Sequence, residues 1–198
     1  MTIGIIGAGN IGGAFAKALG KAGAEAVIAN SRGPDSIAEL VATFGGSIRA
    51  GTVKEAAAQD IVLVAVHWSK IPAALAGLDF SGKVVIDANN PIEAPLYRPV
   101  DLGGRISSDV FADLVPGARV VKAFNHLTPA QLSGDPHSEG GKRVLFYSGD
   151  DRRAKAEVAA IIEQIGFFGI DLGSLSMGGQ LVQFPGGPLP ALNLVKFD

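Results

Sequence analysis

The chain has 198 residues, a formal net charge of −2 and no cysteine, and 47% of its residues are apolar. This composition is typical of a globular protein that is long enough to bury a core. The lack of cysteine excludes disulfides, thiolate zinc sites and a thiol nucleophile. The chain has no long basic run, and no apolar run approaches the length of a membrane span. The N-terminus lacks the pattern of a signal peptide. We therefore expect a cytoplasmic protein that binds neither nucleic acid nor a membrane.

The chain opens with the apolar run IGII at residues 3–6, which leads directly into the glycine loop GAGNIG at 7–12. An amphipathic helix that ends near Gly23 is expected to follow, as in a dinucleotide-binding fingerprint. In that fingerprint Gly7 permits a tight turn, Gly9 lets the backbone approach a pyrophosphate, and Gly12 lets the helix pack close to the strand. The pyrophosphate would lie at the positive end of the helix. The alternative is an ordinary strand–turn–helix without a ligand.

The second apolar run, residues 24–29, ends in Asn30-Ser31-Arg32 instead of the acidic residue that binds the ribose of NAD. Neutral Asn30 does not repel a 2′-phosphate, Ser31 can donate a hydroxyl hydrogen bond, and Arg32 offers a guanidinium to phosphate oxygens. A charge-assisted hydrogen bond contributes about 1.5–3 kcal/mol, so Arg32 alone would favour NADP(H) by about tenfold to a hundredfold. The alternative is that Arg32 is a solvated loop residue.

Strand and helix patterns continue to alternate along the rest of the chain. In order, we expect a helix from Pro34 to 44, a strand over 47–50, a helix from its cap Thr52 to 58, a strand over 61–66, a helix over 72–76, a strand over 84–87, a helix over 109–114, a strand over 119–123, a strand over 143–148, a helix capped by Asp150 or Asp151 and ended by Gly166, and a strand over 167–172. Two long connections, 89–105 and 173–190, are rich in glycine and proline, and we expect them to be structureless loops of the kind that often act as functional lids.

This alternation predicts an α/β protein with a Rossmann-type, doubly wound and mostly parallel sheet that has helices on both faces. We expect one continuous domain over residues 1–198. Within it, residues 1–124 would form the dinucleotide-binding core, and residues 125–198 would extend the sheet and cover the site of the nicotinamide and its acceptor.

Several polar side chains follow the ends of the expected strands, the edge at which open α/β sheets bind ligands. His67 and Trp68 either line a nicotinamide pocket or are a loop histidine and a packed tryptophan. Asn89 and Asn90 are expected to shape the pocket floor. Asn125 follows the strand over 119–123 at the same edge, and a role at the site and an ordinary loop position are equally compatible with it.

The sequence carries no set of residues typical of acid–base or metal catalysis. Its two tyrosines form no Tyr-x-x-x-Lys pair, and its three histidines are not spaced as metal ligands. We therefore assign no catalytic residue and no metal site. Hydride transfer between two cofactor rings does not need a strong general acid or base, because the cofactors carry the reaction.

Motifs along nearly the whole chain resemble the NADPH-dependent coenzyme F420 reductases, also called F420-dependent NADP oxidoreductases. They are the glycine loop, Ser31-Arg32, HW at 67–68, DANNP at 87–91, VVKAFN at 120–125 and DLGSL at 171–175. KAFN and DLGSL are also similar to the cytoplasmic reductase domains of membrane ferric reductases. One departure is that family members often carry another basic residue shortly after the arginine, and residues 33–36 here have none.

By position, the resemblance implies that Gly9, Asn10 and Ile11 meet the pyrophosphate and that Ser31 and Arg32 meet the 2′-phosphate. It also implies that Val66 and His67 lie along the stretch from adenosine to nicotinamide, and that Ala123 lies by the carboxamide. The full predicted cofactor-binding set is Gly7, Gly9, Asn10, Ile11, Gly12, Asn30, Ser31, Arg32, Val66, His67, Trp68, Asn89, Asn90, Ala123 and Asn125.

We therefore predict an NADP(H)-dependent oxidoreductase that transfers hydride between the nicotinamide and a deazaflavin, coenzyme F420, or a flavin-type acceptor. Its partner would be a small-molecule redox acceptor, and the resemblance implies a homodimer. Two alternatives stay open: an NADPH-dependent flavin or ferric reductase, and a redox sensor that binds NADP(H) without turnover.

Overall fold

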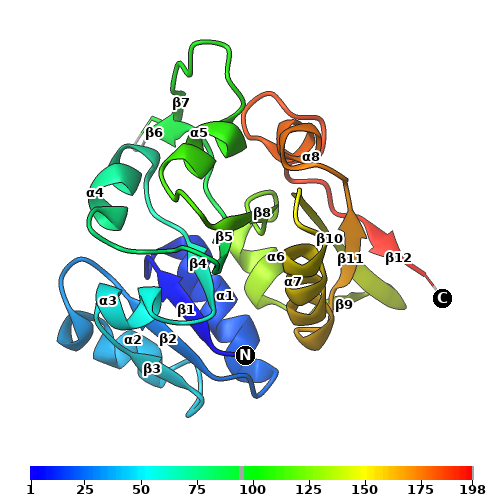
Figure 1. The fold of residues 1–198 in the computed structure, drawn as a ribbon. Coiled ribbons are helices and arrows are strands. Elements are labelled where there is room, and N and C mark those ends of the chain that lie inside the picture. Colours follow the sequence, from blue (N-terminus) through cyan, green and yellow to red (C-terminus); the bar gives the residue numbers. More distant parts are fainter. Residues whose placement is uncertain (94–95, 198) are drawn as a thin grey trace.

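The computed structural model describes residues 1–93 and 96–197 and is built around one large sheet flanked by helices (Figure 1). The order of its main strands is β11-β10-β8-β5-β4-β1-β2-β3. The six strands from β8 to β3 in that order run parallel to one another. They are β1 (Ile3–Ile6), β2 (Ala26–Ala29), β3 (Ile48–Ala50), β4 (Ile61–Val64), β5 (Val84–Asp87) and β8 (Arg119–Ala123).

The C-terminal third joins the same sheet through a strand that reverses direction. β10 (Gly141–Gly149) pairs antiparallel with β8 and parallel with β11 (Phe168–Asp171). Two short strands, β9 (His137–Ser138) and β12 (Val195–Lys196), pair with the start of β10. A separate hairpin of β6 (Ile92–Glu93) and β7 (Arg98–Pro99) lies in the connection after β5. The sheet is therefore mostly parallel, as predicted, with one antiparallel pairing that the alternation of elements did not indicate.

Helices cover both faces of the sheet, which confirms the doubly wound architecture. Strands β1, β2, β4 and β5 are buried at every position, because each is covered on both sides. One core packs Phe15 and Leu19 against the sheet, and the other packs Trp68 and Phe111 against the opposite face. The helices are α1 (Asn10–Lys21), α2 (Ala38–Ala42), α3 (Val53–Ala57), α4 (Ile71–Leu75), α5 (Ser107–Asp113), α6 (Pro129–Ser133), α7 (Arg152–Gln164) and α8 (Leu175–Val182), with 3₁₀ turns η1 (Pro34–Ile37) and η2 (Trp68–Lys70).

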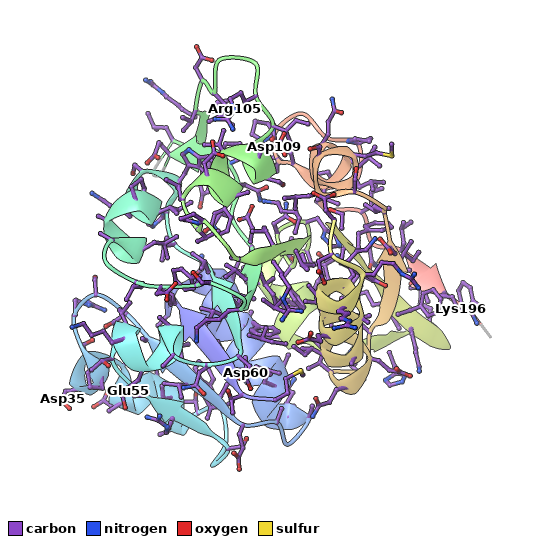
Figure 2. The ribbon with its side chains drawn as sticks, in the orientation of Figure 1. Asp35, Glu55, Asp60, Arg105, Asp109 and Lys196 are labelled. Atoms are coloured by element: carbon purple, nitrogen blue, oxygen red, sulfur yellow. The ribbon has the colours of Figure 1, made fainter. Side chains whose placement is uncertain are left out.

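Local signals at several helix starts act as the sequence indicated. Thr52 forms a capping box with Glu55 at the start of α3. Asp151 caps α7 by accepting the N–H of Ala154 at 2.7 Å, and Asp150 instead accepts the N–H of Leu175 at 3.0 Å. Among the aspartates labelled in Figure 2, Asp60 accepts hydrogen bonds from the N–H and hydroxyl of Thr2. This contact ties the start of β1 to the start of β4.

Helix α1 lies unusually close to the backbone around it. A side chain at Gly12 would collide with the carbonyl of Gly7, and one at Gly20 would collide with the carbonyl of Phe44. Glycine at these two positions therefore lets the helix approach β1 and the end of α2 directly. Among the described residues, no helix combines the length and the apolar character that a membrane span requires.

The expectation of a structureless tail over 173–190 is wrong, because α8 lies within it. Its glycine pair resembles a loop signal, yet side chains at Gly178 and Gly179 would collide with Ser148 of β10 and Ser108 of α5. Tertiary contact therefore overrides the weak helix propensity of glycine. Ser176 adds a hydrogen bond of 2.8 Å to Asp109 of α5, one of the side chains labelled in Figure 2.

Two other expectations need correction. The helix expected from Pro34 to 44 is split into η1 and α2, because the chain starts as a 3₁₀ turn at the proline. The connection 89–105 contains the β6–β7 hairpin, and residues 94 and 95 of that connection lie outside the described residues. Helix α6 was not predicted, although Thr128 and Gln131 form a capping box at its start.

Candidate functional site

A cleft of about 520 Å³ lies at the carboxyl ends of β1, β2, β4 and β5. The strand order reverses here, because β1 lies between β4 and β2, and this is where open α/β sheets bind ligands. The cleft is lined by Ile6, Gly7, Gly9, Asn10, Ile11, Asn30, Ser31, Val53, Ala65, Val66, His67, Trp68, Lys70, Ala74, Ala88, Asn89, Asn90, Ile92 and Tyr97.

The glycine loop presents bare backbone to this cleft. Gly7 has a φ of +111°, and a side chain there would collide with the carbonyl of Ala65. Gly12 is held against the carbonyl of Gly7 as described above. In contrast, a Cβ at Gly9 would meet no atom within 4 Å. Gly9 is also the N-cap of α1 and has no side-chain cap, so the first N–H groups of the helix are available to an anion.

The end of β2 forms a turn held by Asn30. Its Oδ1 accepts the N–H of Arg32 at 2.9 Å, and its Nδ2 lies 2.9 Å from the hydroxyl of Ser36. Ser31 lines the cleft, and Arg32 is exposed next to it. Within the part of the chain that the structure describes, the Arg32 guanidinium has no carboxylate partner. The turn therefore places a free cation beside the cleft.

The end of β4 is fixed to the end of β5 by Asn89. Its side-chain Oδ1 accepts the N–H of Val66 at 3.0 Å, and its Nδ2 donates to the carbonyl of Val64 at 3.0 Å. His67 is exposed at the cleft. Trp68 is only 9% exposed and packs in the core while it also lines the cleft. The two alternatives for this tryptophan are thus compatible.

Asn90 and Asn125 join the cleft to the C-terminal segment. The Nδ2 of Asn90 donates to the carbonyl of Asn125 at 2.8 Å, and the Nδ2 of Asn125 donates to Oδ1 of Asn90 at 2.9 Å. Asn125 also donates to the carbonyl of Val182 at 2.7 Å, and Asn90 accepts the N–H of Phe184 at 3.0 Å. The loops after β5, β8 and α8 therefore meet at this pair.

The cleft brings together most of the predicted set and leaves four members behind its surface or beside it. Gly12 and Ala123 are buried, Asn125 lies behind Asn90, and Arg32 lies next to Ser31. Sequence reasoning missed Ile6, Val53, Ala65, Lys70, Ala74, Ala88, Ile92 and Tyr97. Lys70 could have been found, because it follows His67 within one turn. Tyr97 could not, because it comes from a hairpin that has no recognisable pattern.

The other histidines do not reach the cleft. His126 is 3% exposed, and its Nε2 accepts the N–H of Phe146 at 3.2 Å. Burial and, to a smaller extent, the nearby charge of Lys122 lower the pKa of His126 to about 4, so the ring is neutral. His137 is exposed beside Asp135. No cluster of three metal-ligating side chains occurs in residues 1–93 and 96–197.

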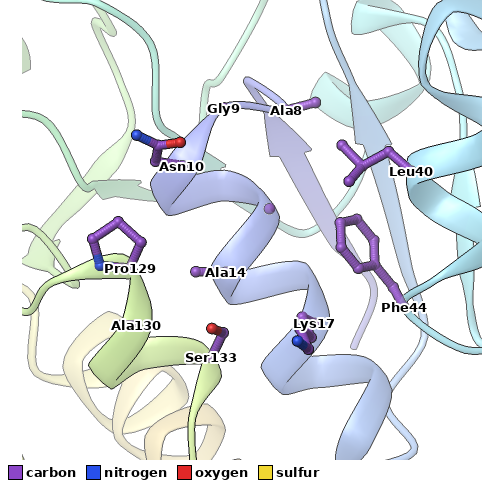
Figure 3. Close-up of a pocket in the computed structure, with 11 residues that line it drawn as sticks. Ala8, Gly9, Asn10, Ala14, Lys17, Leu40, Phe44, Pro129, Ala130 and Ser133 are labelled. Carbon is purple, nitrogen blue, oxygen red and sulfur yellow. The ribbon is translucent and has the colours of Figure 1, made fainter.

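A second pocket of about 410 Å³ lies along the outer side of α1, between α2 and α6. Figure 3 shows Leu40 and Phe44 on one side of the helix and Pro129, Ala130 and Ser133 on the other. Gly9 and Asn10 line both pockets, so the glycine loop separates them. Lys17 is the only ionisable residue among those that line this second pocket.

The doubly wound sheet, the glycine loop at the point where the strand order reverses, and the basic end of β2 are typical of NADP-dependent oxidoreductases. Residues 2–91 match the family model described as NADP oxidoreductase, coenzyme F420-dependent. Over these residues the chain is similar to the NADP-dependent oxidoreductases of this family.

Similar proteins agree with this assignment. The rat (Rattus norvegicus) metalloreductase STEAP3 is 29% identical over 194 residues, which are 96% of this chain and 37% of that protein. The chain thus spans little more than a third of that relative's length. A hypothetical protein, SMa0349 from Sinorhizobium meliloti, has a TM-score of 0.93 and 46% identity, covering 99% of this chain and 96% of that one. A putative F420-dependent NADP-reductase from Arthrobacter sp. FB24 has a TM-score of 0.74 and 26% identity, covering 88% and 86%.

Proposed function

We propose that the protein binds NADP(H) in the cleft and transfers hydride between the nicotinamide and a deazaflavin, coenzyme F420, or a flavin-type acceptor. The observation that carries this proposal is the contrast among the three fingerprint glycines. Gly7 and Gly12 are required by contacts inside the protein, whereas Gly9 faces open space. A glycine without an internal steric reason, at the start of a helix, is explained by the close approach of a pyrophosphate.

The rest of the cleft fits the other parts of the cofactor. Ser31 and Arg32 would bind the 2′-phosphate, because the guanidinium is exposed next to the cleft. Val66 and His67 would lie along the path from adenosine to nicotinamide, with Asn89 and Asn90 as the floor. Ala123 is fully buried and does not line the cleft, so it would bound the carboxamide site only from behind the lining residues.

In this reaction the protein would align the nicotinamide ring with the acceptor ring and exclude water. Hydride transfer is supplied by the nicotinamide and its acceptor when both are bound. The chain's own residues hold the cofactor in one orientation, which turns a bimolecular encounter into a positioned one. Residues 125–198 would cover the reacting rings, since the segment after α8 is bonded to Asn90 at the cleft. We also propose a homodimer that uses a small-molecule acceptor.

A second candidate is an NADPH-dependent flavin or ferric reductase, favoured by the match to a protein named metalloreductase. NADPH absorbance can be followed with coenzyme F420, FMN, FAD and ferric citrate as separate acceptors. Oxidation with F420 supports the main proposal, and oxidation with ferric citrate but not with F420 supports the second. Oxidation with FMN or FAD alone agrees with both, because each includes transfer to a flavin. Tight NADPH binding without turnover on any acceptor would contradict both and leave a redox sensor.

The open space around Gly9 gives a direct test of the cofactor site. Gly9→Ala should leave the thermal midpoint unchanged, because the new methyl group meets no protein atom. It should weaken NADPH binding by about tenfold or more, because the methyl group occupies the place of a phosphate oxygen. Gly46→Ala is the matched control, since a Cβ there also meets nothing within 4 Å. Equal NADPH affinity in both variants would contradict the assignment.

Arg32 tests the choice between the two nicotinamide dinucleotides. Arg32→Ala should weaken NADPH binding by about tenfold to a hundredfold and leave NADH binding nearly unchanged, because only NADPH carries the 2′-phosphate. The control is Arg153, an exposed arginine on α7. Arg153→Ala should change neither the NADPH nor the NADH affinity. Equal losses of NADPH and NADH affinity in the Arg32 variant would show that Arg32 does not bind the 2′-phosphate.

A further inference from the structure

Two opposite charges lie in the interior immediately behind the cleft. The carboxylate of Asp87 and the ammonium of Lys122 are 2.9 Å apart, on neighbouring strands β5 and β8, and both side chains are fully buried. Removing two charges from water costs more free energy than burying apolar side chains of similar size, so a buried pair is a poor way to stabilise a fold. The pair therefore needs an explanation beyond packing.

The bonds of this pair converge on one residue of the cleft. Lys122 donates a second hydrogen bond to the carbonyl of Asn89. The other oxygen of Asp87, Oδ1, accepts the backbone N–H of Asn89 at 3.0 Å and its Nδ2 at 2.8 Å. Asn89 is 3% exposed, and its backbone and side chain are both held by the two charges. The ion pair thus fixes the position and the orientation of this amide.

Asn89 passes that constraint to the neighbouring strand end. Its Oδ1 accepts the N–H of Val66, and its Nδ2 also reaches the carbonyl of Val64. Val66 and Asn89 both line the cleft. The N–H, the carbonyl and both side-chain atoms of Asn89 are therefore engaged within the protein, which leaves it to act as a fixed wall of the cleft.

We propose that Lys122 is a positioning residue for the cofactor: with Asp87 it sets Asn89, and through Asn89 the backbone at Val66, in the binding arrangement before the cofactor arrives. A preorganised wall lowers the ordering cost of binding, and charges held by several hydrogen bonds specify one geometry more strictly than apolar contacts do. This inference rests on the proposed NADP(H) site.

The test replaces the charged pair by neutral side chains of similar size. Asp87→Asn/Lys122→Met removes both charges together, so no unpaired charge is left buried and the variant is expected to unfold cooperatively near the wild-type midpoint. Its NADPH dissociation constant, measured by fluorescence titration, should rise about tenfold, which is about 1.4 kcal/mol. The fluorescence maximum of bound NADPH should also shift toward that of free NADPH, because the ring is held less firmly.

The matched control carries the same two changes at another strand end. Lys155 pairs with Asp171 at 2.9 Å and also bonds the carbonyl of Gly173, away from the residues that line the cleft. Asp171→Asn/Lys155→Met should leave the NADPH dissociation constant within about twofold of the wild type. A folded Asp87→Asn/Lys122→Met variant with wild-type NADPH affinity and fluorescence would overturn the proposal.

A measurement on the wild-type protein covers the case in which that variant does not fold. In free protein the amide of Val66 should exchange with deuterium as slowly as the amides of β4, and NADPH should not slow it further. Fast exchange in free protein, slowed only by NADPH, would overturn the proposal. A failure of the proposed function is recognised separately, because wild-type protein would then show no NADPH binding at all.

Discussion

Two strand ends of this protein use the same set of hydrogen bonds in different surroundings. At each, an aspartate Oδ1 accepts the N–H of the residue two positions later, and a lysine donates both to that aspartate and to the carbonyl of that later residue. The sets are Asp87, Asn89 and Lys122 at β5, and Asp171, Gly173 and Lys155 at β11.

The difference between them is exposure to water. The side chains of Lys122 and Asp87 are 0% exposed, whereas those of Lys155 and Asp171 are 15% and 40% exposed. Water screens the second pair, so its net contribution to stability is small, whereas the loss of one partner from the first leaves a charge stranded in the interior. Two similar patterns of hydrogen bonds therefore differ in their contribution to stability because their exposure to water differs.

The largest expected effect comes from removing one charge of the buried pair. Lys122→Met should lower the free energy of unfolding by about 3–5 kcal/mol, because Asp87 is left without its counter-charge. Urea denaturation of the variant and the wild type measures this difference. A loss of about 1 kcal/mol or less would mean that the interior around Asp87 is as well screened as the surface. It would contradict the expected difference between the buried and the exposed strand end.

The next effect is a pH dependence at the buried strand end. The pKa of His126, near Lys122, is lowered to about 4 from its ordinary value of 6.5, mainly by burial. Between these values the unfolded chain binds a proton that the folded chain does not, so the free energy of unfolding falls as the pH falls from 6.5 to 4. The loss attributable to this group is on the order of 3 kcal/mol.

His126→Gln should remove that part of the pH dependence, and His137→Gln, at an exposed histidine, should retain it. The check is urea denaturation at several pH values across this window. The same slope in both variants would exclude His126 as its source. Near the exposed strand end, burial and then the charge of Asp171 raise the pKa of Tyr147, a group that is already neutral throughout this pH window.

The smallest effect is expected at the exposed pair. Lys155→Met should lower the free energy of unfolding by about 1 kcal/mol or less, and salt should reduce the difference further. Urea denaturation of this variant and the wild type at low and high salt measures both quantities. A loss as large as that of Lys122→Met would show that partial exposure does not protect this site.

Much of the fold followed from local signals in the sequence. The glycine loop, the apolar strands and caps such as Thr52 act within a few residues, so their patterns survive in any context. Helix α8 could not be predicted in this way, because Gly178 and Gly179 have a low helix propensity. Glycine is needed at these positions because the helix lies directly against Ser148 and Ser108. The reversed direction of β10 likewise depends on pairing with β8, which no local pattern specifies.

In the candidate site, too, features set by local sequence signals could be predicted and those set by tertiary contacts could not. The cleft residues on the glycine loop and at the ends of β2 and β4 were predicted from motifs and from their position after strands. The ion pair behind the cleft was not, since Lys122 and Asp87 are 35 residues apart in sequence. A lysine within the apolar run over 119–124 was the available signal, because a buried charge requires a partner nearby.

Helix α1 lies directly against two backbone carbonyls, and this contact has a consequence for directed evolution of the protein. A library that varies this helix should be intolerant at Gly12 and Gly20, whose replacement forces the helix away from its neighbours. Gly13 is different, because a Cβ there would meet only the ring of Phe44, at 3.7 Å. Glycine weakens a helix interior by roughly 0.5–1 kcal/mol relative to alanine. Of the three glycines in α1, Gly13 is therefore the position at which alanine would raise thermostability at no steric cost.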